Sequence, residues 1–200
     1  SPLLHNYWFK KYKIDATYEL INTEEKGLAG IANKIRDKSL SGINVTLPYK
    51  QKIINYTDQI VNDAETTGSV NTLFLDSSSK VIGENTDVFG LQAAYLKEID
   101  NGINHKALVM GAGGVSPSVI LSLQKFGIKK ISITNRTLEK CLFLKKKFKF
   151  LNVLSWDDVS VEIGKYDIVI NATSLGLKDG QDFEFDFVNY NNDMVFIDTI

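Results

Sequence analysis

A run of apolar residues that leads directly into glycines is the feature that most constrains the fold of this chain. Ala107–Met110 is continuously apolar, and the glycine-rich segment Gly111–Gly114 follows it at once. The residues from 116 to about 126 then have the pattern of a helix. A strand, a glycine turn and a helix in this order begin a βαβ unit, whose strands lie parallel in a sheet that helices cover.

The same alternation of strand and helix continues to the end of the sequence. An Asn101-Gly102 turn signal precedes the first strand, and the pattern after the first helix predicts further strands at 130–134, 153–154 and 167–171, a buried strand at 194–198, and helices at about 138–148 and 157–163. We therefore expect a Rossmann-like, doubly wound parallel sheet domain over residues 101–200.

The first half of the chain has a different pattern. It predicts helices at 3–11, at 23–37 with Thr23 as N-cap, at 50–56 and at 58–63, strands at 16–20 and 42–48, and a hairpin formed by 70–75 and 81–85 around a turn at 76–80. A helix from Asp87 to about Ile99 comes next. The sequence thus predicts a separate α/β domain over residues 1–86, with its first strand missing, and a linker helix at 87–100.

Composition and charge exclude several classes of function. Lysine and arginine total 23 against 24 acidic residues, so a net charge of −1 gives no electrostatic reason for a nucleic acid or a membrane surface as partner. No apolar run reaches the roughly 18 residues of a membrane helix. The single cysteine, Cys141, excludes an internal disulfide and favours a reducing, cytoplasmic location. With two histidines and one cysteine, no metal-ligand spacing exists, and we expect no metal.

The two ends of the sequence suggest that it is incomplete. Ser1-Pro2 leads at once into a helical pattern, and the chain stops directly after the predicted strand at 194–198. We therefore expect truncation at both ends.

The glycine turn has the form of a dinucleotide site. Gly111 permits a tight turn, and Gly113 has no side chain to keep a pyrophosphate away from the backbone at the helix N-terminus. Ser116 stands at the third fingerprint position, and it is small although it is not glycine. The alternative is a glycine turn that only ends a structural strand.

The end of the next strand bears on the choice of cofactor. An NAD site places an acid there, about 20 residues after the glycines, to bind the ribose 2′-hydroxyl. This chain has Asn135-Arg136-Thr137 instead, and a guanidinium pairs well with a 2′-phosphate. The sequence favours NADP. The alternative is a helix N-cap, Thr137, beside a surface arginine.

Three polar residues of the first half stand in segments that invite a functional interpretation. Lys50 follows the strand-ending Pro48 at a predicted helix start, where the helix dipole disfavours a cation. Asn71 lies in the first hairpin strand, and Asp87 begins the linker helix. Each also has a plain alternative, as a solvated charge, a strand-edge residue and an ordinary N-cap.

Together these segments resemble the shikimate dehydrogenases. The resemblance runs through the whole chain and rests on these segments in this order: Ser1-Pro2 with His5-Asn6, Asn44 to Lys50, Gly68 to Leu73, Asn85-Thr86-Asp87, Gly111 to Val115, Asn135-Arg136-Thr137, and Asn171 to Ser174. It implies an oxidoreductase that interconverts 3-dehydroshikimate and shikimate with NADP in aromatic amino acid (chorismate) biosynthesis. It also implies two domains around a cleft, with the cofactor on the second and the substrate on the first.

The resemblance also implies the roles of individual residues. Lys50 and Asp87 would form the catalytic pair, and the substrate would be bound by Ser1, Thr46, Lys50, Asn71 and Asp87. The cofactor would be contacted by Gly111, Ala112, Gly113, Gly114, Val115, Asn135, Arg136, Thr137, Ala172, Thr173 and Thr199. His5, on the first helix, is better explained as a packing or hydrogen-bonding residue.

The chain departs from the family pattern at a few positions. Pro117 replaces an arginine that often follows the glycine turn, and Thr199 stands where many members carry a hydrophobic residue. The first serine of the family's Ser-x-Ser-Pro segment and its later tyrosine and glutamine lie outside this sequence. These departures affect details of ligand contact more than the assignment.

Two rival functions remain open at this point. One is a quinate dehydrogenase, or an enzyme that uses both quinate and shikimate, from the same superfamily. The other is a catalytically silent NADP-binding module, which would not need both Lys50 and Asp87. The sequence leaves a monomer and a homodimer equally open.

Overall fold

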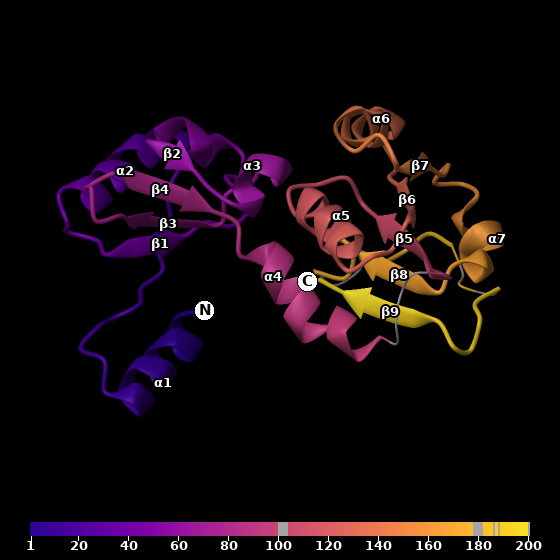
Figure 1. Cartoon of the computed structure of the whole chain (residues 1–200), viewed down its shortest axis with the longest axis horizontal. Helices are drawn as coiled ribbons and strands as arrows, with labels where there is room; N and C mark the ends of the chain where they lie inside the picture. Colours follow the sequence, from indigo (N-terminus) through magenta and orange to yellow (C-terminus); the bar gives the residue numbers. More distant parts are fainter. Residues whose placement is uncertain (100–103, 178–181, 186, 188, 200) are drawn as a thin grey trace.

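The computed structural model describes residues 1–99, 104–177, 182–185, 187 and 189–199, and it contains two sheets. Figure 1 shows two domains side by side, with α4 running between them. The first domain contains, with η marking a 3₁₀ helix, α1 (Pro2–Tyr12), η1 (Glu25–Gly27), α2 (Leu28–Arg36), β1 (Gly42–Asn44), η2 (Lys52–Tyr56), β2 (Gln59–Ile60), α3 (Asp63–Thr67), β3 (Thr72–Leu75) and β4 (Val81–Glu84). The remainder contains α4 (Asp87–Ala94), η3 (Leu96–Glu98), β5 (Lys106–Met110), α5 (Ser116–Lys125), β6 (Lys130–Thr134), α6 (Leu138–Lys147), β7 (Asn152–Val153), α7 (Val159–Glu162), η5 (Ile163–Lys165), β8 (Ile168–Asn171) and β9 (Val195–Asp198).

The sheet of the first domain is mixed, with the strand order β1-β3-β4-β2. The predicted hairpin is confirmed, because β3 and β4 pair antiparallel and β1 adds to the other side of β3. Side chains from α2, η2 and α3 pack against this sheet, and the core contains Leu28, Ile35, Ile53, Ala64 and Leu73. The alternation of inward and outward side chains along β3 accounts for this core on one face.

Three expectations for the first domain are wrong. Gln59 and Ile60 form β2, which pairs parallel with β4, so 58–63 is not a helix. Residues 16–20 form no strand, because the main chain of Tyr18 hydrogen-bonds to the side-chain amide of Asn6 and not to a neighbouring strand. Thr23 caps no helix: its hydroxyl donates to the carbonyl of Glu24 (3.1 Å), and η1 intervenes before α2.

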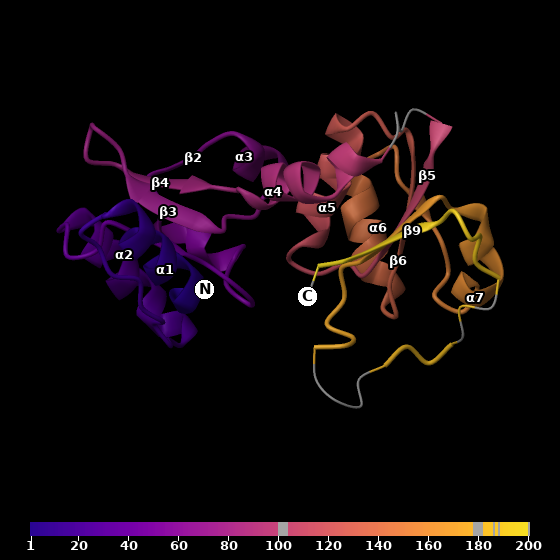
Figure 2. The same cartoon turned by 90° about the horizontal axis from the view of Figure 1, so that it is seen from below.

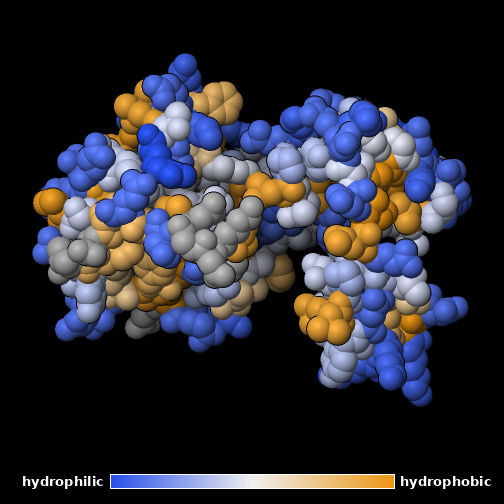
Figure 3. Space-filling view, turned by 180° about the vertical axis from the view of Figure 1, so that it is seen from behind, coloured by the Kyte–Doolittle hydropathy of each residue, from blue (hydrophilic) through white to orange (hydrophobic). Residues whose placement is uncertain are grey.

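Helix α1 is set apart from the rest of the first domain. It has no buried residue, and Leu3 is 90% exposed. Figure 3 shows it as a lobe below the body of the domain, with hydrophobic side chains on its surface. His5 stacks on Tyr18 with 4.2 Å between ring centroids, and the Tyr18 hydroxyl donates to Asn44 Oδ1 (2.9 Å). The prediction of a packing role for His5 is confirmed.

The second sheet is parallel throughout, with the order β7-β6-β5-β8-β9. Alternate residues of β5 enter two different cores. Ala107 and Val109 pack with α5 and α6, whereas Leu108 and Met110 pack with α7 and the phenylalanines of 183–187. The continuous apolar run of β5 is explained because both faces of its sheet are covered. The expected Rossmann-like parallel sheet is therefore confirmed.

One strand of this sheet differs from its prediction. The segment 194–198 was expected to be a buried strand, yet Val195 is 37% and Phe196 47% exposed in β9, and only Ile197 is buried. The reason is position, because among the described residues β9 is the last strand of the sheet and has β8 as its one partner. The predicted Asn101-Gly102 turn lies outside the described residues.

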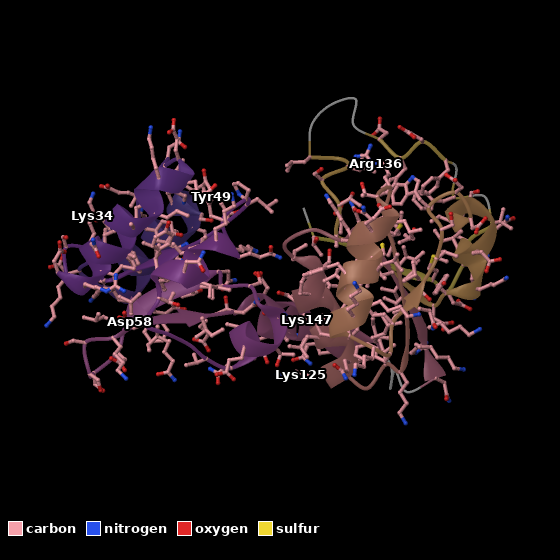
Figure 4. The ribbon with its side chains drawn as sticks, turned by 90° about the horizontal axis from the view of Figure 1, so that it is seen from above. Lys34, Tyr49, Asp58, Lys125, Arg136 and Lys147 are labelled. Carbon is pink, nitrogen blue, oxygen red and sulfur yellow. The ribbon has the colours of Figure 1, made fainter. Side chains whose placement is uncertain are left out.

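The two domains contact each other beside α4. An ion pair joins Lys125, at the end of α5, to Asp63 of α3. Lys147, at the end of α6, reaches Gly68 of the first domain. A Cβ added to Gly68 would lie 2.8 Å from the Lys147 ammonium. Burial lowers the pKa of this lysine. Figure 4 shows Lys125 and Lys147 in the part of the second domain next to the first.

Within the described residues no helix is long and apolar enough to cross a membrane, and no group of three acidic, histidine or cysteine side chains gathers as in a metal site.

The burial of Cys141 gives a test of the second core. The side chain is fully buried between α6 and the sheet, and burial raises the pKa of its thiol to about 11. Because the thiolate is the reactive form, we expect no reaction with Ellman's reagent at pH 8 in the folded protein and one reactive thiol after denaturation. A native thiol that reacts as fast as free cysteine contradicts this packing.

Candidate functional site

An ion pair between Lys50 and Asp87 is the centre of the candidate site. Lys50 Nζ lies 2.8 Å from Asp87 Oδ2, and the two side chains are 14% and 23% exposed. The pair is thus sheltered but still reachable from solvent. The alternative of a freely solvated Lys50 is excluded by this contact.

Asn71 binds the other oxygen of the same carboxylate. Its Nδ2 donates to Asp87 Oδ1 (2.7 Å) and lies 3.0 Å from Thr86 Oγ1, and its Oδ1 accepts from the main-chain N–H of Thr86 (3.0 Å). Asn71 is 9% exposed, so it is not a solvated strand-edge residue. Both oxygens of Asp87 therefore have a donor, which fixes the orientation of the carboxylate.

Local chain geometry places the two partners. Lys50 lies in the turn before η2, where its carbonyl accepts from the N–H of Val70 (2.8 Å), so it precedes the helix that was expected to begin with it. Asp87 is the first residue of α4, and Thr86 occupies the N-cap position. The alternative of Asp87 as an ordinary N-cap is therefore wrong.

The other two predicted substrate residues, Thr46 and Ser1, are not part of the described hydrogen bonds around the ion pair. Thr46 is exposed, and its carbonyl accepts from the N–H of Tyr49 (3.0 Å), which holds the turn that leads to Lys50. Ser1 occupies the N-cap position of α1, where its carbonyl accepts from the N–H of His5. The N-terminus lies at the end of α1 that faces the second domain (Figures 1 and 2). None of the described hydrogen bonds joins Ser1 or Thr46 to the ion pair.

Asn44 is a polar residue of this region that sequence reasoning did not select. Its Nδ2 donates to Thr72 Oγ1 (3.2 Å), and that hydroxyl donates to Asn71 Oδ1 (3.0 Å). The available signal was its spacing, because Asn44 and Thr46 are two residues apart in an extended segment and so project to one side.

The glycine turn lies at the carboxyl end of β5. Gly111 has φ +109°, and a Cβ on it would be 2.6 Å from the carbonyl oxygen of Ala172. A Cβ on Gly113 would have no atom within 4 Å. The first glycine is thus required by a close approach of two strand ends, and the second leaves open space in front of the turn.

Side chains complete the turn. Ser116 Oγ accepts from the N–H of Gly113 (3.0 Å) and donates to the carbonyl of Gly111 (2.9 Å). Asn135 Oδ1 accepts from the N–H of Ala112 (3.2 Å), and its Nδ2 donates to the carbonyl of Thr137 (3.0 Å). Asn135 therefore braces the turn with both ends of its amide.

The turn keeps donors for a ligand. No described hydrogen bond involves the N–H of Gly114 or of Val115, and both precede α5. Free N–H groups at a helix N-terminus bind phosphate well. Open space at Gly113 together with these donors fits the pyrophosphate of a dinucleotide.

Arg136 and Thr137 follow β6 at the same edge of the sheet. Arg136 is exposed, and no described hydrogen bond or ion pair holds its guanidinium; Figure 4 shows it away from the junction marked by Lys125 and Lys147. Thr137 is the N-cap of α6 but makes no side-chain cap bond. Their proposed role in dinucleotide binding rests only on their position at the carboxyl end of β6.

Asn171 organises the third strand end and was not among the predicted contacts. Its Oδ1 accepts from the N–H and the hydroxyl of Thr173 (3.0 and 2.7 Å), and its carbonyl accepts from the hydroxyl of Thr199 (2.8 Å). Ala172 is buried against the glycine turn. The predicted contacts of the second domain thus gather at the carboxyl ends of neighbouring strands, where ligands bind in open α/β sheets.

A cavity of about 490 Å³ lies between the two domains. It is lined by Leu47, Pro48, Lys50, Gln51, Ala112, Gly113, Gly114, Glu139, Lys140, Phe143 and Leu144. The catalytic candidate Lys50 and the glycine turn therefore face one space. Lys140 was not selected from the sequence, and it lies in the first turn of α6, four residues after Arg136.

The chain is similar to known proteins over both domains. Residues 1–73 match a family described as shikimate dehydrogenase substrate binding domain, and residues 94–178 match one described as shikimate/quinate 5-dehydrogenase. A shikimate dehydrogenase (NADP⁺) of Pelagibacter ubique is 40% identical over 200 residues, which are all of this chain and 74% of that protein.

Solved structures of shikimate dehydrogenases are also similar to nearly the whole chain. Shikimate dehydrogenase from Aquifex aeolicus superposes with a TM-score of 0.90 at 32% identity, covering 98% of this chain and 72% of that one. The enzyme from Thermus thermophilus, solved in complex with NADP(H) and shikimate, gives a TM-score of 0.85 at 26% identity over 98% and 72% of the two chains.

The two glycines of the turn provide a matched test of the site. Gly111→Ala forces a side chain into a left-handed backbone conformation and against Ala172, so we expect a loss of about 1 to 3 kcal/mol in the free energy of unfolding. Gly113→Ala should leave the melting temperature unchanged, since its Cβ points into open space, but should weaken dinucleotide binding. Thermal unfolding and dinucleotide titration separate the two effects. Equal behaviour of the two variants contradicts this division of roles.

Proposed function

This chain belongs to the shikimate dehydrogenase family, and we propose that it catalyses the reversible NADPH-dependent reduction of 3-dehydroshikimate to shikimate in aromatic amino acid biosynthesis. The observation that carries the proposal is the Lys50–Asp87 ion pair, whose lysine lines the same cavity as the glycine turn. We place the domain boundary in residues 87–100, where α4 and η3 connect the two sheets.

The residues of the first domain bind the substrate and move the proton. NADPH, when bound, supplies the hydride for the ketone carbon. The Lys50 ammonium donates a proton to the ketone oxygen, so that the carbonyl becomes a hydroxyl without a free alkoxide. Asp87 holds the ammonium in place through Oδ2, and Lys50 regains its proton from solvent, to which it is partly exposed.

The polar groups around the Lys50–Asp87 ion pair orient the substrate. Shikimate carries several hydroxyls and a carboxylate. Asn71 and Asp87 lie beside the ammonium, and the exposed hydroxyl of Thr46 lies four residues before Lys50 along the same turn. We propose that these side chains bind the substrate hydroxyls and that Ser1 binds the carboxylate.

The second domain binds the cofactor through the turn and two cations. The free N–H groups of Gly114 and Val115 bind the pyrophosphate, and Arg136 pairs with the 2′-phosphate of NADP. Lys140, which lies in the first turn of α6 and lines the cavity, adds a second positive charge. At the ends of β8 and β9, the nicotinamide would be contacted by Ala172, Thr173 and Thr199. This arrangement favours NADP over NAD.

The rival functions are separated by one set of assays. We expect turnover of shikimate with NADP⁺, and slower turnover with quinate or with NAD⁺. The absence of turnover with all four combinations, alongside measurable NADP binding, supports a silent binding module instead. The ordered ion pair disfavours that module, because binding of the cofactor alone does not require it.

The role of Arg136 is tested by its substitution. Loss of a charge-assisted bond to phosphate costs about 1.5 to 3 kcal/mol, so Arg136→Ala should weaken NADP binding by roughly tenfold to a hundredfold. NAD affinity should change far less. Lys140→Ala should act in the same direction with a smaller effect, and Lys129→Ala, a substitution outside the cavity, serves as the charge control. Equal losses of NADP and NAD affinity would show a structural role for Arg136.

The role of Lys50 is tested by rate and affinity together. A positioned proton donor contributes about 10²- to 10⁴-fold to kcat, and Lys50→Ala should lower kcat by that factor. NADP affinity should be nearly unchanged, because the predicted cofactor contacts lie in the second domain. Lys50→Arg should not restore the rate, since a guanidinium releases a proton too reluctantly near neutral pH. A near-normal kcat with only a raised KM makes Lys50 a binding residue.

A further inference from the structure

We propose that Asn85 is a positioning residue that holds Asp87 in place and connects it to the glycine turn of the other domain. The inference rests on the proposed function and extends it to a buried residue outside the proposed substrate and cofactor contacts. Asn85 lies between the end of β4 and the start of α4, and its side chain is 3% exposed.

One end of the Asn85 amide binds Asp87. Its Oδ1 accepts from the main-chain N–H of Asp87 at 3.0 Å. This bond fixes the first residue of α4, whose own carboxylate then meets Lys50 and Asn71. A change at Asn85 therefore reaches the ion pair through the backbone that carries it.

The other end of the amide spans the two domains. Its Nδ2 lies 2.8 Å from the carbonyl of Ser69 and 3.1 Å from Thr67 Oγ1, both in the first domain. It also lies 2.9 Å from Ser118 Oγ, on α5 of the second domain. All three neighbours are buried, so this polar group cannot exchange its partners for water without opening the junction.

A second bond completes a connection to the cofactor site. Ser69, which is fully buried, donates its hydroxyl to the carbonyl of Gly114 (3.3 Å). A path of hydrogen bonds thus runs from Gly114 through Ser69 and Asn85 to Asp87. Because the hydride and the proton must arrive on one carbonyl group, the spacing between glycine turn and ion pair matters to the reaction.

The test compares three variants of the full chain. Asn85→Ala removes both ends of the connection, and Ser118→Ala removes only the neighbour in the second domain while Asn85 keeps Thr67 and Ser69. Gln92→Ala is the matched control. Gln92 also joins α4 to α5, through its Nε2 and the carbonyl of Ser122 (3.3 Å), but it has no contact with Asp87.

We expect Asn85→Ala to lower kcat at least about tenfold, with NADPH affinity unchanged. The primary isotope effect on kcat, measured with NADPH deuterated at the transferred position, should rise because hydride transfer becomes rate-limiting. Ser118→Ala should change kcat in the same direction by less. Gln92→Ala should leave both quantities at the wild-type values. A separate readout needs no turnover: hydrogen exchange at the Asp87 amide should accelerate in Asn85→Ala and stay slow in Gln92→Ala.

The opposite results overturn the inference. A folded Asn85→Ala protein that loses thermal stability but keeps kcat and isotope effect shows a merely structural residue. If Asn85→Ala does not fold, Ser118→Ala decides, and wild-type kcat and isotope effect in that variant contradict the proposal. Failure of the wild-type protein to turn over shikimate overturns the proposed function instead, and hydrogen exchange at Asp87 then still decides whether Asn85 holds that residue.

Discussion

The hydrogen bonds at the carboxylate of Asp87 are the constraint on which the candidate site depends. Its two oxygens accept from donors in two separate segments, Lys50 in the turn before η2 and Asn71 just before β3, while its own backbone begins α4. The site therefore forms only when the first domain has packed. An ion pair sheltered in this way also requires both partners, because a partly buried charge left alone is costly.

The second domain contributes a different kind of constraint. Parallel pairing of β5 with β6 and β8 brings three chain segments that are far apart in the sequence to one edge of the sheet. The close approach of Gly111 to Ala172 shows how tightly two of these ends meet. The shape of the dinucleotide site is thus a consequence of strand order and of side chains that brace the turn, namely Ser116 and Asn135.

Strands that are buried on both faces of the sheet were predictable, because such strands appear in the sequence as continuous runs of apolar residues. Strand β5 and its glycine turn are of this kind. The two-residue strand β2 is too short to show any period, and the exposure of β9 depends on its place at the sheet edge. The prediction for Lys50 rested on the family resemblance of its segment, because a lone lysine is usually a solvated charge, and the structure places it in an ion pair with Asp87. The bracing roles of Asn135 and Asn171 arise from tertiary hydrogen bonds, which no local pattern encodes.

The exposure of Arg136 has a consequence for how such proteins diversify. No described contact within the chain depends on its guanidinium, so the fold does not need the residue that is proposed to choose the cofactor. Replacement of Arg136 by an acidic residue therefore carries little penalty in folding. The residue proposed to set cofactor preference is therefore exposed. It can be substituted, in evolution or by design toward NAD, without a change in the glycine turn or in the buried junction around Asn85.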